Sequence, residues 1–113
     1  MKVAIIGAGA SGLMTAININ NSEVTIFEKL NTSAKKILAT GNGKCNFSNR
    51  NMKTDCFYTD DYKKLDKILK EYTSDKICDF FEDAGVLYRE KNGYLYPYSE
   101  QASCVREMLY KRM

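Results

Sequence analysis

Three glycines at a fixed spacing follow a short apolar segment near the N-terminus. Residues 3–17 read VAIIGAGASGLMTAI, with Gly7, Gly9 and Gly12 in a GxGxxG pattern. In the dinucleotide fingerprint the first glycine makes a tight turn, the second lets the backbone approach a pyrophosphate, and the third allows close helix packing. The free N–H groups of the following helix then face the phosphates. The pattern predicts a dinucleotide site, and an unliganded glycine turn is the alternative.

An acidic residue stands where the fingerprint expects a ribose ligand. Glu28 ends the next predicted strand, at the usual distance of about 20 residues from the glycines. A carboxylate there accepts hydrogen bonds from both ribose hydroxyls and repels a 2′-phosphate. This argues against NADP, although the neighbouring Lys29 weakens the argument slightly.

A second polar segment, KILATGNGKCNFSN, spans residues 36–49. Its glycines free the backbone to present N–H donors, its lysines can neutralise phosphate charge, and its hydroxyl and amide groups can donate or accept hydrogen bonds. The residues concerned are Lys36, Thr40, Gly41, Gly43, Lys44 and Asn46. A surface turn with incidental lysines is the alternative. Since an NAD-type domain usually continues with another crossover here, the long loop favours the larger cofactor FAD over NAD.

Composition excludes several other kinds of site. The net charge of +3 is spread without a basic block, which gives a nucleic-acid surface no support. The four cysteines form no CxxC pair and the chain has no histidine, which argues against a metal site and against Ser–His or Cys–His catalysis. The longest apolar run, residues 3–6, is too short for a membrane span or a signal peptide. We therefore expect a cytoplasmic protein without membrane or nucleic-acid partners.

The elements that must position these motifs follow from periodicity. A strand at 2–6, a helix at 11–20 and a strand at 24–28 predict a parallel βαβ unit with a right-handed crossover. A helical turn is expected at 33–37. Two strands cannot complete a parallel sheet, and no later segment supplies an obvious third. We therefore expect an α/β, Rossmann-type fold in which residues 1–113 are the N-terminal part of an FAD-binding domain in a longer chain.

The second half is predicted to contain helices and a hairpin. Apolar residues at spacings of three and four predict helices at 61–72 and 74–84, with Ser74 as N-cap and Gly85 as the stop. Residues 86–98 predict a β-hairpin with Asn92–Gly93 at a type I′ turn. Ser99 is expected to open a last helix, with one apolar face formed by Ala102, Val105, Met108 and Leu109.

The segments GAGASG, FEK and KKILATGNGKCNFSN together resemble the BaiN/YhiN-like flavoproteins, an FAD-binding group that includes proteins known as aminoacetone oxidases and bile-acid reductases. The loop hallmark of that group, G-R-K-x-x-x-S-G-x-G-R-C-N-x-[ST]-N, is matched at Lys36, Gly41, Gly43, Cys45, Asn46, Ser48 and Asn49. Departures are Ala34–Lys35 in place of Gly–Arg, Thr40 in place of serine and Lys44 in place of arginine. The similarity extends through the predicted hairpin and last helix.

The resemblance implies an FAD-dependent oxidoreductase acting on a small organic substrate, with NAD(P)H or the substrate supplying electrons. The cofactor-binding residues that it implies are Gly7, Ala8, Gly9, Ala10, Ser11 and Gly12 at the pyrophosphate, Glu28 and Lys29 at the ribose, and Lys36, Thr40, Gly41, Gly43, Lys44, Cys45 and Asn46 toward the flavin. No catalytic residue is identified, and a packing role is favoured for Cys45 over a redox role. Two alternatives remain: an NAD-binding dehydrogenase-like domain in which the loop binds substrate, and a non-enzymatic dinucleotide-binding module.

The hairpin also carries four tyrosines, at Tyr88, Tyr94, Tyr96 and Tyr98. They could contact a flavin ring or a substrate. Alternation along a hairpin more often produces one packed face, and a structural role is therefore the preferred interpretation.

Overall fold

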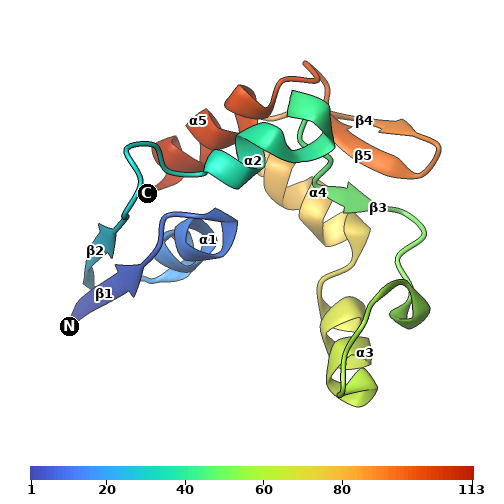
Figure 1. The fold of residues 1–113 in the computed structure, drawn as a ribbon, viewed down its shortest axis with the longest axis horizontal. Helices are drawn as coiled ribbons and strands as arrows, with labels where there is room; N and C mark the ends of the chain where they lie inside the picture. Colours follow the sequence, from blue (N-terminus) through green and yellow to red (C-terminus); the bar gives the residue numbers. More distant parts are fainter.

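Five α-helices, five β-strands and two 3₁₀ turns make up the computed structural model, which describes residues 1–113 (Figure 1). In chain order they are β1 (Lys2–Ile6), α1 (Ala10–Asn18), β2 (Glu23–Phe27), α2 (Lys35–Ala39), η1 (Thr40–Gly43), β3 (Ser48–Asn49), η2 (Thr54–Cys56), α3 (Tyr62–Glu71), α4 (Ser74–Asp83), β4 (Tyr88–Lys91), β5 (Tyr94–Pro97) and α5 (Ala102–Arg112). The chain forms no helix of the length and apolarity that a bilayer crossing requires.

Strands β1 and β2 pair in parallel, with Lys2 opposite Glu23 and Ile6 opposite Phe27. The predicted βαβ unit is confirmed, with α1 beginning one residue earlier and ending two residues earlier than expected. Helix α1 contacts both strands, and alternate strand residues on its side are half-buried. On the other face Ile6 is 83% exposed and Phe27 is 56% exposed. This two-stranded sheet therefore has one covered face and one open face.

A second sheet has the order β3-β5-β4 and is antiparallel throughout. The predicted hairpin is confirmed, and its turn has positive φ at Asn92 (53°) and Gly93 (84°), as a type I′ turn requires. Strand β3 was not predicted, because its two polar residues show no alternation. It forms through pairing with Leu95 and Tyr94 of β5.

The packed face of β5 is not the tyrosine face. Leu95 and Pro97 are fully buried, whereas Tyr94 and Tyr98 on the other side of the strand are exposed. The preferred interpretation of the tyrosines as the packed face is therefore wrong for β5. The apolar residues between the tyrosines form the contact with the rest of the molecule, and the guanidinium of Arg89 lies over the Tyr98 ring.

The predicted helices are confirmed, but two of their starts differ. Helix α4 is capped by Thr73, whose hydroxyl oxygen accepts the Lys76 N–H, and not by Ser74. Helix α5 begins at Ala102 rather than at Ser99. Glu100 has φ of 53°, a left-handed conformation that cannot continue a helix backward to Ser99.

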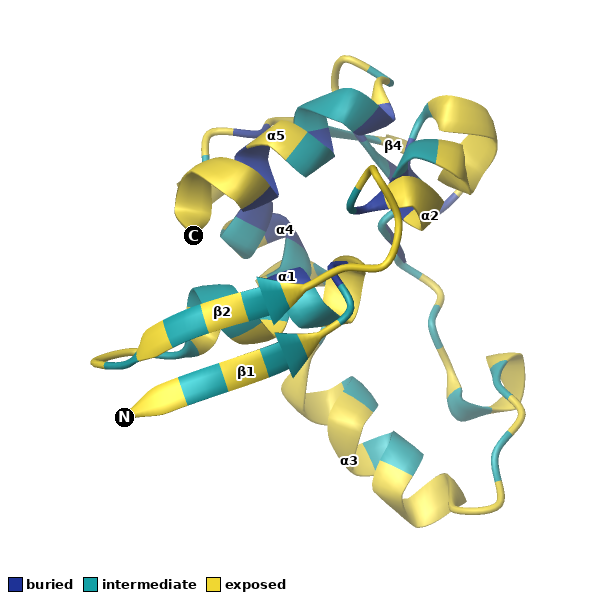
Figure 2. Ribbon diagram, turned by 60° about the vertical axis from the view of Figure 1, so that its left-hand side comes forward, coloured by how far each residue is buried: buried dark blue, intermediate teal, exposed yellow.

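The core lies where α1, α2, α4 and α5 meet. The four residues predicted for the apolar face of α5 are all buried, and Leu13, Ile37 and Phe81 belong to the same cluster. Figure 2 shows the buried residues gathered on the inner sides of α4 and α5, while α3 projects away from this body. The two sequence motifs thus sit on the border of the core.

Candidate functional site

Two of the three fingerprint glycines are required by the local fold. Gly7 has φ of +96°, a conformation that favours glycine, and its N–H donates to the Phe27 carbonyl at 2.7 Å. A Cβ atom on Gly12 would lie 2.0 Å from the Gly7 carbonyl oxygen. The predicted roles of Gly7 in the turn and of Gly12 in helix packing are therefore confirmed.

Gly9 differs from its two neighbours in the motif. Its φ of −81° is accessible to any residue, and no atom lies within 4 Å of a Cβ placed on it. Neither backbone strain nor packing within the chain requires glycine here. What the missing side chain does is leave open space above the N-terminus of α1, as close approach of a ligand would need.

The first turn of α1 offers hydrogen-bond donors to that space. No side chain caps the helix and no acidic residue lies in its first turn. The backbone N–H groups of Ala10, Ser11 and Gly12 have no acceptor within the helix, because they lie in its first turn. The helix dipole also favours an anion at this end. The geometry suits a phosphate group.

Glu28 lies beside the fingerprint, where its carboxylate accepts the Leu30 N–H at 2.8 Å and the Ala8 N–H at 2.7 Å. These backbone hydrogen bonds, that of Leu30 foremost, lower the pKa of Glu28. Each carboxylate oxygen keeps accepting capacity for a further donor. Ala8 is buried and already bonded, so its part is to position the loop, while Lys29 is exposed at the end of β2.

The second motif folds back on itself. Positive φ angles occur at Gly41, Asn42, Gly43 and Cys45. The Lys44 N–H donates to the Gly41 carbonyl at 3.2 Å and the Cys45 N–H donates to the Thr40 carbonyl at 3.0 Å. The expected concave set of N–H donors is thus wrong for Lys44 and Cys45, because tight turns consume those two groups internally.

The polar side chains of this loop have different surroundings. Lys36 is exposed on α2 and forms no ion pair. The Thr40 hydroxyl donates to the Ile37 carbonyl at 2.8 Å. Lys44 is half-buried. The pKa of Glu100 is lowered mainly by a hydrogen bond from Lys91, and the charge of Lys44 lowers it further. Lys36 is therefore the more available cation.

Cys45 is 5% exposed and belongs to the core cluster. Burial raises the pKa of its thiol, against a smaller opposite effect of the Thr40 hydroxyl. A thiol in such surroundings stays protonated and is a poor nucleophile. These observations support the packing role favoured for Cys45.

Asn46 connects the loop to the second sheet. With its amide nitrogen facing two carbonyl oxygens, it donates to Ser48 at 2.8 Å and to Leu95 at 3.1 Å. The side chain predicted to bind a ligand therefore braces β3 against β5, and only its remaining surface faces a cavity.

A cavity of about 900 Å³ brings the two motifs together. Ala10 lines it from the fingerprint helix, and Thr40, Cys45 and Asn46 line it from the loop. Sequence reasoning missed the rest of the wall, which includes Met14 and Asn18 of α1, Phe80 and Phe81 of α4, and Val105 and Leu109 of α5. The only signal for the α1 residues was their spacing of four from Ala10, which places all three on one face.

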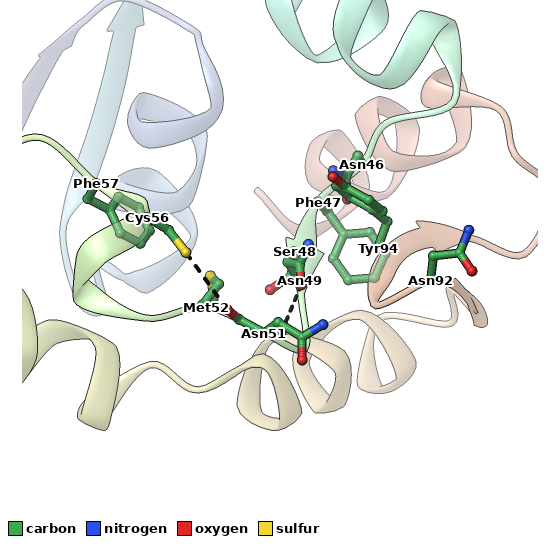
Figure 3. Close-up of a pocket in the computed structure, with 10 residues that line it drawn as sticks. All are labelled: Asn46, Phe47, Ser48, Asn49, Asn51, Met52, Cys56, Phe57, Asn92 and Tyr94. Carbon is green, nitrogen blue, oxygen red and sulfur yellow. Dashed lines mark hydrogen bonds between the residues drawn. The ribbon is translucent and has the colours of Figure 1, made fainter.

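A second cavity, of about 510 Å³, adjoins the Asn46–Phe47 segment (Figure 3). Asn46 and Phe47 line both cavities. The rest of its lining comes from the segment 48–57, which includes Asn49 and Asn51, and from the hairpin, which includes Asn92. No three histidine, cysteine or acidic residues gather anywhere as a metal site would need.

Comparison with known proteins identifies the family to which the chain belongs. The model of the HI0933-like protein Rossmann domain matches residues 1–113. The chain belongs to this family. The resemblance noted from the sequence and the Rossmann-type fold class are thereby confirmed, and the family is one of flavoproteins.

Two curated relatives cover nearly all of the chain. It is 38% identical over 112 residues to a 3-dehydro-bile acid delta(4,6)-reductase of Clostridium scindens, a match that takes in 96% of the chain and 27% of that protein. It is 32% identical over 108 residues to a ribosomal RNA dihydrouridine synthase of Haemophilus influenzae, with 93% of the chain and 27% of the relative aligned. The chain thus spans about a quarter of the length of these relatives.

Proposed function

We propose that the protein is an FAD-dependent oxidoreductase and that residues 1–113 are the N-terminal part of its FAD-binding domain. The observation that carries this proposal is that both motifs line one cavity. Ala10 follows the fingerprint turn directly, and it shares the lining of this cavity with Thr40, Cys45 and Asn46. A cofactor that extends from the fingerprint to the loop needs a dinucleotide with a second large ring system, which FAD has.

Different residues would bind different parts of the cofactor. The N–H groups of Ala10, Ser11 and Gly12 would bind the pyrophosphate, with Gly9 leaving room for it, and Glu28 would accept hydrogen bonds from the ribose. Lys36, which is exposed on α2, would attract phosphate charge, and the loop of residues 40–46 would form one wall for the flavin. When bound, the flavin supplies the electron transfer, while the chain binds it, orients it and excludes water.

We propose further that the reaction adds hydrogen to a ring of a small organic substrate, with NAD(P)H as electron donor. Support comes from the names of the two relatives, since one is a reductase and the other a dihydrouridine synthase. Both names denote addition of hydrogen. The absence of a basic block in this chain favours a small molecule over a nucleic acid as substrate.

The test is to purify the full-length gene product and identify its cofactor. We expect a yellow protein with a flavin absorption spectrum, from which heat releases FAD, identified by mass spectrometry. Anaerobic addition of NADH or NADPH should then bleach the flavin band. A colourless protein that is stabilised by NAD instead would contradict the proposal.

A further inference from the structure

We infer that the tyrosine-bearing face of the β3-β5-β4 sheet binds the electron donor, a nicotinamide dinucleotide. Its rings would pack on Tyr94 and Tyr98, and its phosphates would contact Arg89 and Lys91. The inference rests on the proposed function, in which NAD(P)H is the electron donor. It concerns the hairpin tyrosines, to which the packing of the chain and the flavin proposal give no part.

The tyrosines lie on the side of the sheet that faces solvent. Leu95 and Pro97 of β5 are fully buried. The alternate residues point the other way, since Tyr94 is 47% exposed, Tyr98 is 59% exposed and Tyr96 between them is half-buried. Two aromatic rings on one sheet face are thus open to a ligand.

Strand β4 adds two cations to the same face. Arg89 pairs with Tyr96 and Lys91 pairs with Tyr94. Residues directly opposite each other in an antiparallel pair have their side chains on one face. Arg89 and Lys91 therefore lie beside the row of tyrosines.

The spacing of the two exposed rings suits a dinucleotide. Tyr94 and Tyr98 are four residues apart along an extended chain, which is roughly 14 Å at the usual rise of a strand. An extended dinucleotide carries two flat rings separated by two riboses and a pyrophosphate, a span of similar length. Flat rings stack on aromatic side chains, and the phosphates between the rings would then meet the cations of β4.

Arg89 is a cation without a carboxylate partner. Its guanidinium carbon lies 4.4 Å from the centre of the Tyr98 ring, and it forms no ion pair. By contrast, Arg50 pairs with both Asp75 and Glu90, the latter on the opposite face of β4. A stacked guanidinium keeps the N–H groups at its edge available for a phosphate. The unpaired Arg89 is therefore the observation that points to an anionic ligand.

The surroundings of Glu100 show an excess of positive charge at this place. Lys91 forms an ion pair with Glu100. The hydrogen bond from Lys91 is the main reason why the pKa of Glu100 is lowered, and the charges of Lys44 and Arg89 lower it further. Three cations around one carboxylate leave two positive charges in excess. The negative charge of a pyrophosphate complements this excess.

The face adjoins the loop that would form one wall for the flavin. A Cβ on Gly41 would lie 3.3 Å from the Tyr96 ring, and Figure 1 shows the hairpin beside α2 and η1. An electron donor has to reach the flavin, so a position next to this loop suits it. A single-stranded nucleic acid would need a longer track of cations, and the carboxylate of Glu100 interrupts the one present here.

The test measures binding of the oxidised dinucleotides NAD⁺ and NADP⁺, which do not reduce the flavin, to the full-length FAD-loaded protein. Isothermal titration calorimetry should show saturable binding of at least one of them. The affinity should fall as the salt concentration rises, because salt screens the contacts between phosphates and exposed cations.

Substitutions then locate the site. Arg89→Gln should weaken binding of that dinucleotide roughly tenfold or more, and Tyr98→Leu should weaken it about fivefold or more. The FAD content of both variants should stay unchanged, because neither residue lines the cofactor cavity. Lys67→Gln and Tyr62→Leu are the matched controls, since both residues are exposed on α3, which projects away from the body (Figure 2). They should leave binding unchanged.

The two proposals fail in different ways. A yellow protein that binds neither dinucleotide, or binds it equally well in the Arg89 and Tyr98 variants, overturns the inference and leaves the flavin proposal standing. If these variants instead lose affinity for a single-stranded oligonucleotide and keep that for the dinucleotides, the inference is overturned and the face belongs to nucleic acid. A colourless protein contradicts the proposed function. Dinucleotide binding by such a protein that Arg89→Gln weakens would still uphold the site on the sheet.

Discussion

The two glycine motifs of this chain use glycine for opposite purposes. In the fingerprint, Gly9 has an ordinary backbone conformation and no neighbour within 4 Å of a side-chain position. In the loop, Gly41 has φ of +55°, and a Cβ there would lie 2.7 Å from the Asn46 nitrogen. The missing side chain of Gly9 leaves room for a ligand, whereas that of Gly41 is required by the packing and the backbone conformation of the chain itself.

This difference separates two kinds of contribution to one site. The fingerprint presents backbone donors to open space, so we expect its effect on cofactor binding to be direct. The loop uses the N–H groups of Lys44 and Cys45 for its own turns, so it acts mainly as a shaped wall. Substitutions in the two motifs should therefore change stability and cofactor affinity in different proportions.

The largest effect is expected for Gly12→Ala. A Cβ would lie 2.0 Å from the Gly7 carbonyl, and α1 would have to move away from β1. We expect the free energy of unfolding of the apoprotein to fall by roughly 3 kcal/mol, the upper end of the range for overpacking. Urea denaturation of the full-length protein measures it, and an unchanged midpoint would show that the helix does not pack on the strand as described.

Gly41→Ala should destabilise less, by about 1–2 kcal/mol, because it combines a left-handed backbone with a 2.7 Å contact. Gly43→Ala is the control, since its φ is +81° but its nearest contact is Leu38 O at 4.0 Å. The same denaturation experiment should rank Gly41→Ala below Gly43→Ala in stability. The reverse order would mean that Asn46 does not lie against Gly41.

Glu28→Gln tests the ribose end of the site. Its pKa is lowered by backbone hydrogen bonds, that of Leu30 first and that of Ala8 second. The ionised carboxylate is therefore favoured in the folded state, and its stabilising effect is present above the usual carboxyl pKa and lost as the pH falls through the lowered value. We expect the Glu28→Gln variant to bind FAD roughly tenfold more weakly at neutral pH. Because glutamine does not titrate, the variant should also lack the loss of stability on acidification that the wild-type carboxylate causes. Fluorescence titration with FAD measures the first, and identical acid unfolding of both proteins would contradict the second.

The smallest effect concerns thiol reactivity in the intact protein. Cys56 is exposed, whereas Cys45 and Cys78 are buried, and burial raises the pKa of both buried thiols. Iodoacetamide at neutral pH should modify Cys56 first, as followed by mass spectrometry of peptides. Rapid modification of Cys45 would contradict its packing role and reopen a redox function.

Local signals explain which parts of the fold were predictable. The βαβ unit and the hairpin follow from glycine spacing and the Asn92–Gly93 turn, which act over a few residues. Strand β3 was missed because it depends on pairing with β5, far along the chain. The start of α5 was misplaced because the left-handed conformation of Glu100 follows no propensity rule.

The candidate site was predictable to a similar degree. Spacing alone located the fingerprint and Glu28, and the structure places them side by side. The amide-lined cavity could not be predicted, because Asn49 and Asn92 are brought together only by the second sheet. The inward hydrogen bonds of the loop were also hidden, since a glycine-rich sequence looks the same whether its N–H groups face a ligand or the loop itself.

Gly9→Ala tests most directly whether the open space at the fingerprint belongs to a cofactor. With φ of −81° and no contact to disturb, the substitution should change the free energy of unfolding of the apoprotein by no more than about 1 kcal/mol, as expected at a helix N-cap. FAD affinity of the same full-length protein should fall roughly tenfold or more, since a methyl group would occupy the space for the pyrophosphate. Unchanged FAD affinity at unchanged stability would contradict the assignment.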